Sequence, residues 1–136
     1  MATRIATVVG ALLVAVGASL AVSTTAEAKV LYGAIVYRWS GNGYQHGFFS
    51  DYPSSARLIM DIQNKWGSNA GYVVVRSGQC AALAYFRNAK HSQHERGFGT
   101  GKAESADAAS NIALRDARNQ IAFGGNTKLV RYDCQK

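Results

Sequence analysis

The stretch "YVVVRSGQCAALAY", from Tyr72 to Tyr85, decides how this chain of 136 residues is organised. It contains two runs of β-branched, aromatic and small apolar residues, which are typical of β-strands, and only residues 77–79 join them. Cys80 follows the join at once, and the second cysteine of the chain, Cys134, lies near its end. We interpret this join as the seam between two copies of one structural unit, with the two cysteines at equivalent places.

Comparison of the sequence with itself supports this duplication. The offset between matching segments rises along the chain, so we expect insertions in the loops of the second copy, where extra residues cost little. The alignment makes His46 and Arg96 equivalent positions. The matches are "AIVY" at Ala34 with "ALAY" at Ala82 (48 residues apart), "HGFFSDYPSSA" at His46 with "RGFGTGKAESA" at Arg96 (50 apart), and "VVVR" at Val73 with "KLVR" at Lys128 (55 apart).

Each copy shows the order strand, strand, helix, strand. In the first copy the turn "SGNG" follows an apolar strand that ends near Trp39, and the apolar spacing predicts a helix over residues 55–66. In the second copy we expect strands over residues 81–87, 95–98 and 127–132 and a helix over residues 105–122. One unit is too small to bury its own sheet and helix. The sequence therefore predicts an α+β fold, a duplicated β-β-α-β unit with about six strands and two helices in one compact domain.

Both expected helices have an apolar face. The residues on these faces are Leu58, Ile59, Ile62 and Trp66 in the first helix and Ala106, Ala109, Ile112, Ala113 and Ala117 in the second. The small alanines of the second helix predict a close approach of that helix to its sheet.

The first 28 residues have the pattern of a signal peptide. Arg4 precedes an uncharged apolar run over residues 5–22, and Ala26-Glu27-Ala28 matches the small-x-small cleavage rule. We expect cleavage before Lys29, which leaves residues 29–136 as a single domain built of two repeats, about 30–79 and 80–135. An uncleaved membrane anchor is the alternative, and no later stretch is apolar enough to span a bilayer. The expected location is the medium or the cell envelope, and the processed chain is not expected to span a membrane.

The chain is basic, with 15 Lys and Arg against 8 Asp and Glu and a net charge of +7. Removal of the leader takes away one charge of each sign and leaves the net charge unchanged. Such a surface favours polyanions such as nucleic acid, anionic lipid or acidic wall polymers. The basic residues are scattered, however, with no run of three, so we favour a simple role in solubility.

Two cysteines in an exported chain indicate one disulfide, Cys80 to Cys134, which would staple the two copies together. On the chain-entropy model such a loop stabilises the folded state by about 4 kcal/mol. Two free thiols or an intermolecular bridge are the alternatives.

The segments "YGAIVY…GNGYQHGFF", "VVVR…CAALAY…GFGTGKAESADAASNIAL" and "LVRYDC" resemble the bacterial secreted family called domain of unknown function 4189. The resemblance covers nearly all of residues 31–134. It implies a duplicated β-β-α-β fold in a small exported protein, and some members of the family are regarded as exported effectors. Members often carry further cysteines near the helix ends, whereas the corresponding segments here, "IQNKWGSNAG" and "ARNQIAFGGN", have none.

Three motifs suggest chemistry. The pair His91 and His94 has a spacing that binds metals when a third ligand such as His46 is supplied, but the spacing is common by chance and we predict no metal. His46, His94 and Glu95 form a candidate general acid–base set, as in small secreted nucleases. "GFGTGK", residues 97–102, is one residue short of a phosphate-binding loop and lacks the following Ser or Thr, so we interpret it as a turn into the helix.

From sequence alone we favour a non-enzymatic exported domain that binds a partner in the envelope, the medium or a host, with no cofactor. The partner would be an unidentified protein or an anionic polymer. Two alternatives stay open: a small exported, nuclease-like hydrolase that acts on a polyanion through His46, His94 and Glu95, and an electrostatic binder of nucleic acid or acidic wall polymer. The expected binding residues, on the hairpin face, are Arg38, Tyr44, His46, Phe48 and Arg96.

Overall fold

Two β-β-α-β units follow one another along the chain in the computed structural model, which describes residues 28–88, 95–121 and 125–136. Both helices begin after a serine N-cap: the hydroxyl oxygens of Ser54 and Ser105 accept hydrogen bonds from backbone N–H groups of the first turn. The elements are β1 (Tyr32–Ser40), β2 (Gly43–Tyr52), α1 (Ser55–Trp66), β3 (Gly71–Arg76), β4 (Gln79–Asn88), β5 (Glu95–Ala103), α2 (Ala106–Asn119) and β6 (Asn126–Gln135). The predicted duplicated α+β fold is confirmed.

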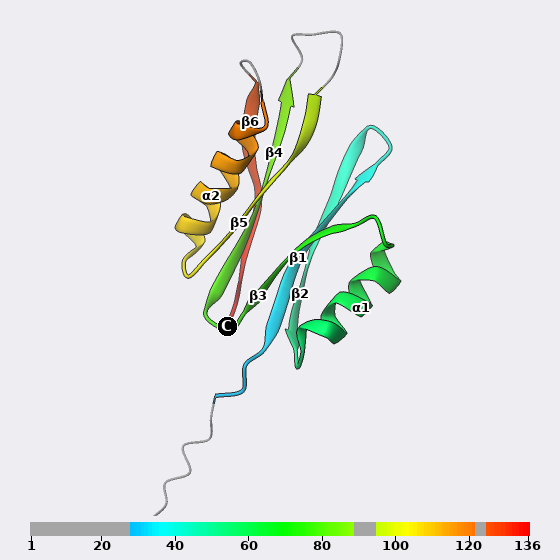
Figure 1. Ribbon diagram of the computed structural model, residues 1–136, viewed down its shortest axis with the longest axis vertical. Coiled ribbons are helices and arrows are strands. Elements are labelled where there is room, and N and C mark those ends of the chain that lie inside the picture. Colours follow the sequence, from blue (N-terminus) through cyan, green and yellow to red (C-terminus); the bar gives the residue numbers. More distant parts are fainter. Residues whose placement is uncertain (1–27, 89–94, 122–124) are drawn as a thin grey trace, which may run out of the picture.

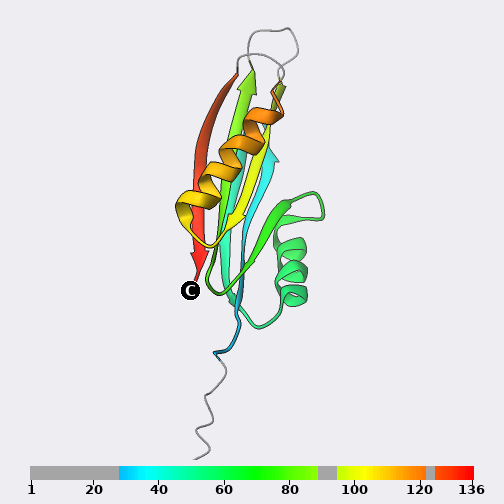
Figure 2. The same ribbon diagram turned by 60° about the vertical axis from the view of Figure 1, so that its left-hand side comes forward.

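Each unit forms its own antiparallel sheet of three strands, with the first strand of the unit in the centre. The strand order is β2-β1-β3 in the first sheet and β5-β4-β6 in the second. The two sheets face each other, α1 covers the outer face of the first and α2 the outer face of the second (Figure 1). The fold is therefore a four-layer sandwich, and Figure 2 shows α2 lying along the outside of its sheet. No helix in the described part of the chain is long and apolar enough to cross a bilayer.

An apolar layer between the two sheets joins the units. Its buried residues are Ile35 and Val75 from the first sheet and Ala81 and Leu83 from the second. Ile35, Ala81 and Leu83 have no exposed surface and Val75 has 1%. Because side chains alternate along a strand, the neighbours of these residues point to the outer faces, where each sheet packs against its own helix.

Strand pairing corrects the sequence alignment of the repeats. Ala34 pairs with Val74 and Ala82 pairs with Tyr132, so Val74 and Tyr132 are equivalent, 58 residues apart rather than the 55 expected for this strand. The pairing of β4 with β6 shifts at a bulge between Leu83 and Ala84, and the alignment of the two repeat sequences did not reveal this bulge.

The second strand of each unit is shifted as well. Tyr37 pairs with His46 and Tyr85 with Phe98, so the structural equivalent of His46 is Phe98 and not Arg96.

The predicted disulfide between Cys80 and Cys134 is present, but it does not staple the two units. Cys80 lies in β4, after the seam, and pairs directly with Cys134 of β6 in the same sheet. The bridge therefore closes the second unit on itself.

The seam turn itself forms one backbone hydrogen bond to each unit. The backbone N–H of Ser77 donates to the carbonyl of Leu31 at 2.8 Å, and the N–H of Gly78 donates to the carbonyl of Gln135 at 2.8 Å. The φ angle of Gly78 is +86°, a conformation that favours glycine in this tight turn. The entry to β1, the seam turn and the end of β6 thus lie together at one end of the sandwich (Figure 1).

The Gln135 side chain extends this contact between the sheets. It is 2% exposed, and its amide donates to Asp51 Oδ1 at 2.9 Å while its carbonyl oxygen accepts from the Asp51 N–H at 3.0 Å. Asp51 has a φ of +65°, which turns its N–H and its carboxylate toward Gln135 at the end of β2. Both polar groups of a buried amide are therefore satisfied by a residue of the other unit.

The sequence suggested that the "GFGTGK" segment forms a turn. In the structure it is part of β5. A Cβ on Gly99 would lie 2.3 Å from the Ala113 carbonyl oxygen, and one on Gly101 would lie 2.1 Å from the Ala109 carbonyl oxygen. These glycines let the backbone of α2 rest on the strand, as the alanines of α2 predicted. Asp116 of α2 also accepts a hydrogen bond from the Thr100 N–H at 2.9 Å, which caps the outer edge of β5.

The helix faces differ slightly from the predicted ones. In α2 the buried residues are Ala109, Ser110, Ala113 and Ala117, whereas Ile112 is 40% exposed, so its place on the predicted apolar face was wrong. The α1 helix packs through larger side chains, with Leu58 and Ile62 fully buried and Trp66 partly buried against the first sheet.

We predict that Gly101→Ala destabilises the fold by about 1–3 kcal/mol or more, because the new methyl group would overlap the α2 backbone. Gly43→Ala is the matched control, since the nearest heavy atom to a Cβ there is 3.8 Å away. Urea unfolding of the oxidised protein measures both. Equal free energies of unfolding for the two variants would contradict the direct contact between helix and strand.

We predict that Gln135→Ala lowers the free energy of unfolding by about 1–3 kcal/mol, because it leaves polar groups of Asp51 without their partner. Gln120→Ala removes an exposed glutamine that donates to the Phe98 carbonyl, and we expect a smaller loss there. Chemical denaturation of both variants measures the two losses. A Gln135→Ala variant as stable as the parent would show that the hydrogen bonds between Gln135 and Asp51 do not contribute to stability.

Candidate functional site

The end of the sandwich opposite the seam carries a pocket. The β1–β2 turn of the first unit and the ends of β4 and β5 in the second unit meet there (Figure 1). The pocket has a volume of about 480 Å³ and is lined by Asn42, Tyr85, Arg87 and Arg96. Pockets of 300–1,000 Å³ are the usual size for small ligands, and both units contribute to this one.

Arg96 bridges the two units at this pocket. Its guanidinium carbon lies 4.3 Å from the centroid of the Trp39 ring, a cation–π contact. Its Nη1 donates to the backbone carbonyl of Asn42 at 3.0 Å. A guanidinium has five N–H groups, so these contacts fix the position of Arg96 and leave further donors for a ligand.

Arg87 and Arg96 lie directly opposite each other on β4 and β5. Like charges at paired positions of an antiparallel sheet repel each other. Among the side chains that the structure describes, the one ion pair is that of Arg131 with Asp133, so no described carboxylate neutralises Arg87 or Arg96. Both side chains are exposed, and the pair forms a local concentration of positive charge.

Aromatic rings form the wall beneath these arginines. The rings of Tyr44 and Tyr85 stack with centroids 4.8 Å apart, and Tyr44 meets Phe98 edge-on at 5.4 Å. Trp39 contacts Phe98 at 4.6 Å and is 42% exposed. The cluster continues the apolar layer between the sheets out to the solvent, where it ends in the two arginines.

The structure brings together two of the predicted binding residues, Tyr44 and Arg96. Arg38 lies elsewhere, on the face of the first sheet that α1 covers. Its guanidinium stacks on Trp66 at 5.0 Å and donates to the Trp66 carbonyl oxygen at 3.0 Å, and its Nε donates to Gln45 Oε1. These contacts hold Arg38 at the C-terminal end of α1, away from the pocket.

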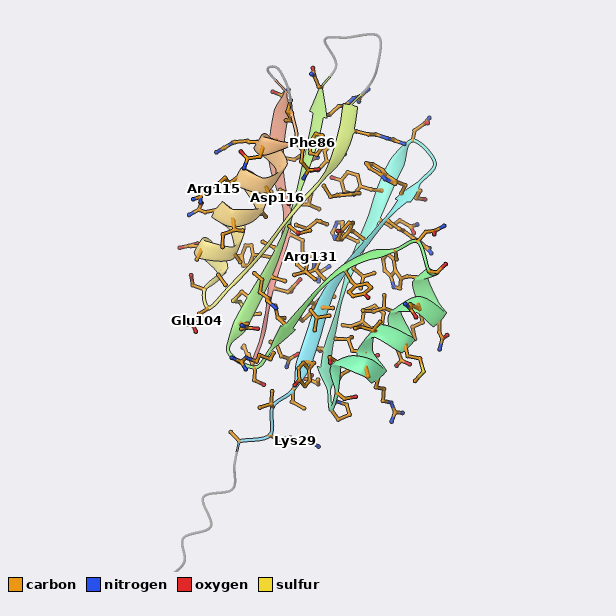
Figure 3. The ribbon with its side chains drawn as sticks, viewed as in Figure 1. Lys29, Phe86, Glu104, Arg115, Asp116 and Arg131 are labelled. Carbon is orange, nitrogen blue, oxygen red and sulfur yellow. A yellow bond between two sulfur atoms is a disulfide. The ribbon has the colours of Figure 1, made fainter. Side chains whose placement is uncertain are left out.

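Phe48 and His46 face the second sheet from β2. Phe48 is partly buried against the apolar layer between the sheets, so it serves packing. The His46 ring lies 6.3 Å from Tyr44, and the charges of Arg131 and Asp133 act on it from β6. Figure 3 shows Arg131 in the space between the two sheets.

The His46 ring is exposed, but neighbouring atoms desolvate it in part, and this effect, followed by the positive charge of Arg131, holds its pKa below the usual value of 6.5, while Asp133 opposes both. Burial has the opposite effect on a phenol, and it raises the pKa of Tyr37 with a smaller contribution from Asp116.

The acid–base hypothesis depends on residues beyond the described part of the chain. His94, like His91, lies outside the described residues, and Glu95 begins β5 with a side chain that is not described. The hydrolase therefore stays a prediction. Within the described residues no group of three or more His, Cys, Asp or Glu side chains is arranged to hold a metal ion.

Trp39, Tyr85 and Arg87 are site residues that sequence reasoning missed. Alternation along β4 places Tyr85 and Arg87 on the same face as Leu83, and this signal was available in the sequence. What was not available is the sheet that covers this face, because that depends on how the two units pack.

A second, smaller pocket of about 260 Å³ lies beside β3, with Arg76 and Lys102 in its wall. Lys102 Nζ donates to the Val74 carbonyl at 3.2 Å, so this cation already has a partner on the open edge of β3.

Comparisons of the whole chain with protein-family models, with curated proteins and with solved structures gave no significant match.

We predict that His46 titrates below 6.5, and that Asp133→Asn lowers its pKa further because it removes the opposing negative charge. Arg131→Gln should shift the pKa upward. Proton NMR of the imidazole signals measures all three, with His46→Gln used for assignment. An upward shift in Asp133→Asn would contradict the proximity of β2 and β6.

The sign of the pH effect on stability follows from the lowered pKa. The unfolded chain binds a proton at His46 more readily than the folded protein does. The contribution of neutral His46 to the free energy of unfolding is therefore complete above pH 6.5 and is lost as the pH falls through the pKa of His46 in the folded protein.

Proposed function

We propose that this protein is an exported binding domain that recognises an anionic partner at the pocket end of the sandwich. The single observation that carries the proposal is the pair Arg87 and Arg96, two exposed cations at facing positions with no described carboxylate beside them. A folded protein gains nothing in stability from such a pair, whereas a bound anion relieves the repulsion.

The surroundings of the pair support recognition rather than general solubility. Arg96 is held in place by Trp39 and Asn42 of the other unit, so its position does not have to be ordered when a partner binds. Exposed Trp39 adds an aromatic surface next to the charge, and Trp, Tyr and Arg are the residues that contribute most to binding at protein interfaces.

Export is part of the proposal. It is supported by the leader-like residues 1–28 and by the disulfide, since such bridges persist in oxidising compartments. We retain membership of the domain of unknown function 4189 family as a hypothesis that agrees with the duplicated fold.

Retention on immobilised heparin, a polyanion, tests the proposal. We expect the Arg87→Gln/Arg96→Gln variant to elute at clearly lower salt than the control Arg57→Gln/Arg115→Gln, which loses the same charge from exposed positions on α1 and α2. Figure 3 shows Arg115 pointing outward from α2. If both double variants elute together, retention reports net charge alone and the proposed surface is wrong.

A further inference from the structure

We propose that the pocket between Arg87, Arg96 and Tyr85 binds a phosphate monoester whose organic part carries a ring that packs against Tyr85. This inference rests on the proposed function and specifies its ligand. It makes the pocket a site for a small phosphorylated group, whether free in solution or attached to a polymer.

The charge at the pocket indicates a dianion. Arg87 and Arg96 carry two positive charges at paired positions, and Lys128 Nζ lies 6.0 Å from the centroid of the Tyr85 ring on the β6 side. None of these cations forms an ion pair with a described side chain. A carboxylate or a sulfate ester brings one negative charge, whereas a phosphate monoester brings close to two at neutral pH, because its second pKa is about 6.

The geometry of the donors also suits phosphate. A guanidinium offers planar pairs of N–H groups that match two oxygens of a phosphate at once. Arg96 uses its Nη1 on the Asn42 carbonyl and lays its plane near Trp39, so its remaining N–H groups keep a fixed direction. Arg87, on the neighbouring strand β4 of the same sheet, supplies a second guanidinium to the other oxygens of the phosphate group.

Tyr85 is the residue that we propose contacts the organic part of the phosphate monoester. Its ring stacks on Tyr44 at 4.8 Å, and Lys128 Nζ lies 6.0 Å from its centroid, so a ligand contacts the part of Tyr85 that lines the pocket. An aromatic surface beside an anion site favours a ligand with a flat ring or the apolar face of a sugar. The volume of about 480 Å³ exceeds the needs of inorganic phosphate and accommodates such a ring.

The experiment uses the oxidised protein and three probes at about pH 7.5: phenyl phosphate, inorganic phosphate and phenyl sulfate, which has the same ring with a single charge. Isothermal titration gives the affinities, and NMR of the arginine Nε–H and tryptophan indole signals locates the site. We expect phenyl phosphate to bind at least about tenfold more tightly than either of the other probes.

The variants separate the two parts of the ligand. Arg87→Gln should weaken phenyl phosphate by about tenfold or more, while Arg115→Gln, an exposed arginine on α2, should leave it unchanged. Tyr85→Leu should abolish the advantage of phenyl phosphate over inorganic phosphate. Arg87→Gln removes a like-charge pair from an exposed position, so this variant should fold at least as stably as the parent, and unfolding does not imitate loss of binding.

Three results would overturn the inference: equal affinity for phenyl sulfate and phenyl phosphate, no effect of Arg87→Gln on binding, or no binding of phenyl phosphate at about 10 mM. That concentration is far above the dissociation constants typical of small ligands. If heparin retention still depends on the two arginines in that case, the proposed function survives and only the ligand is wrong. If phenyl phosphate binds as expected but heparin retention is insensitive to the arginines, the pocket is a small-molecule site and the polyanionic partner is wrong.

Discussion

The apolar layer between the two sheets is the contact that makes one protein of two similar units. Ile35 and Val75 on one side meet Ala81 and Leu83 on the other, and all four are buried. Each unit already uses the outer face of its sheet to hold a helix, so its inner face would be exposed without the other unit. Burial of that face is a large favourable contribution that neither the seam hydrogen bonds nor the disulfide replaces, since the disulfide lies within the second unit.

The same layer explains why the candidate site lies where it does. At the seam end, the buried amide of Gln135 joins the sheets through Asp51. At the other end no covalent connection holds the sheets together, and the apolar residues give way to an aromatic cluster capped by Arg96 on Trp39. A pocket with walls from both units forms only because the sheets are held face to face. The proposed anion site is therefore a product of the duplication and is not contained in either copy.

The order of the strands and helices within each unit could be predicted from the sequence, whereas the packing of the two units against each other could not. The helix over residues 55–66 has the predicted bounds, because its serine cap and the glycine after it are local signals. The role of Gly99 and Gly101 was misjudged, since a glycine-rich segment indicates a turn unless a helix is known to lie against it. Arg87 was missed for a similar reason: alternation tells which strand face it shares, but only packing shows that this face meets the other unit.

Native-state hydrogen exchange of a Leu83→Ala variant tests most directly whether the layer between the sheets unites the two units. The substitution lies in β4 and removes apolar contacts that should be worth about 2–5 kcal/mol. If the layer unites the units, the slowest amides of β1 and β4 lose the same free energy of exchange, because both open in one global unfolding. Loss of protection in β4, with β1 unchanged, would show that the units unfold independently and would contradict the account.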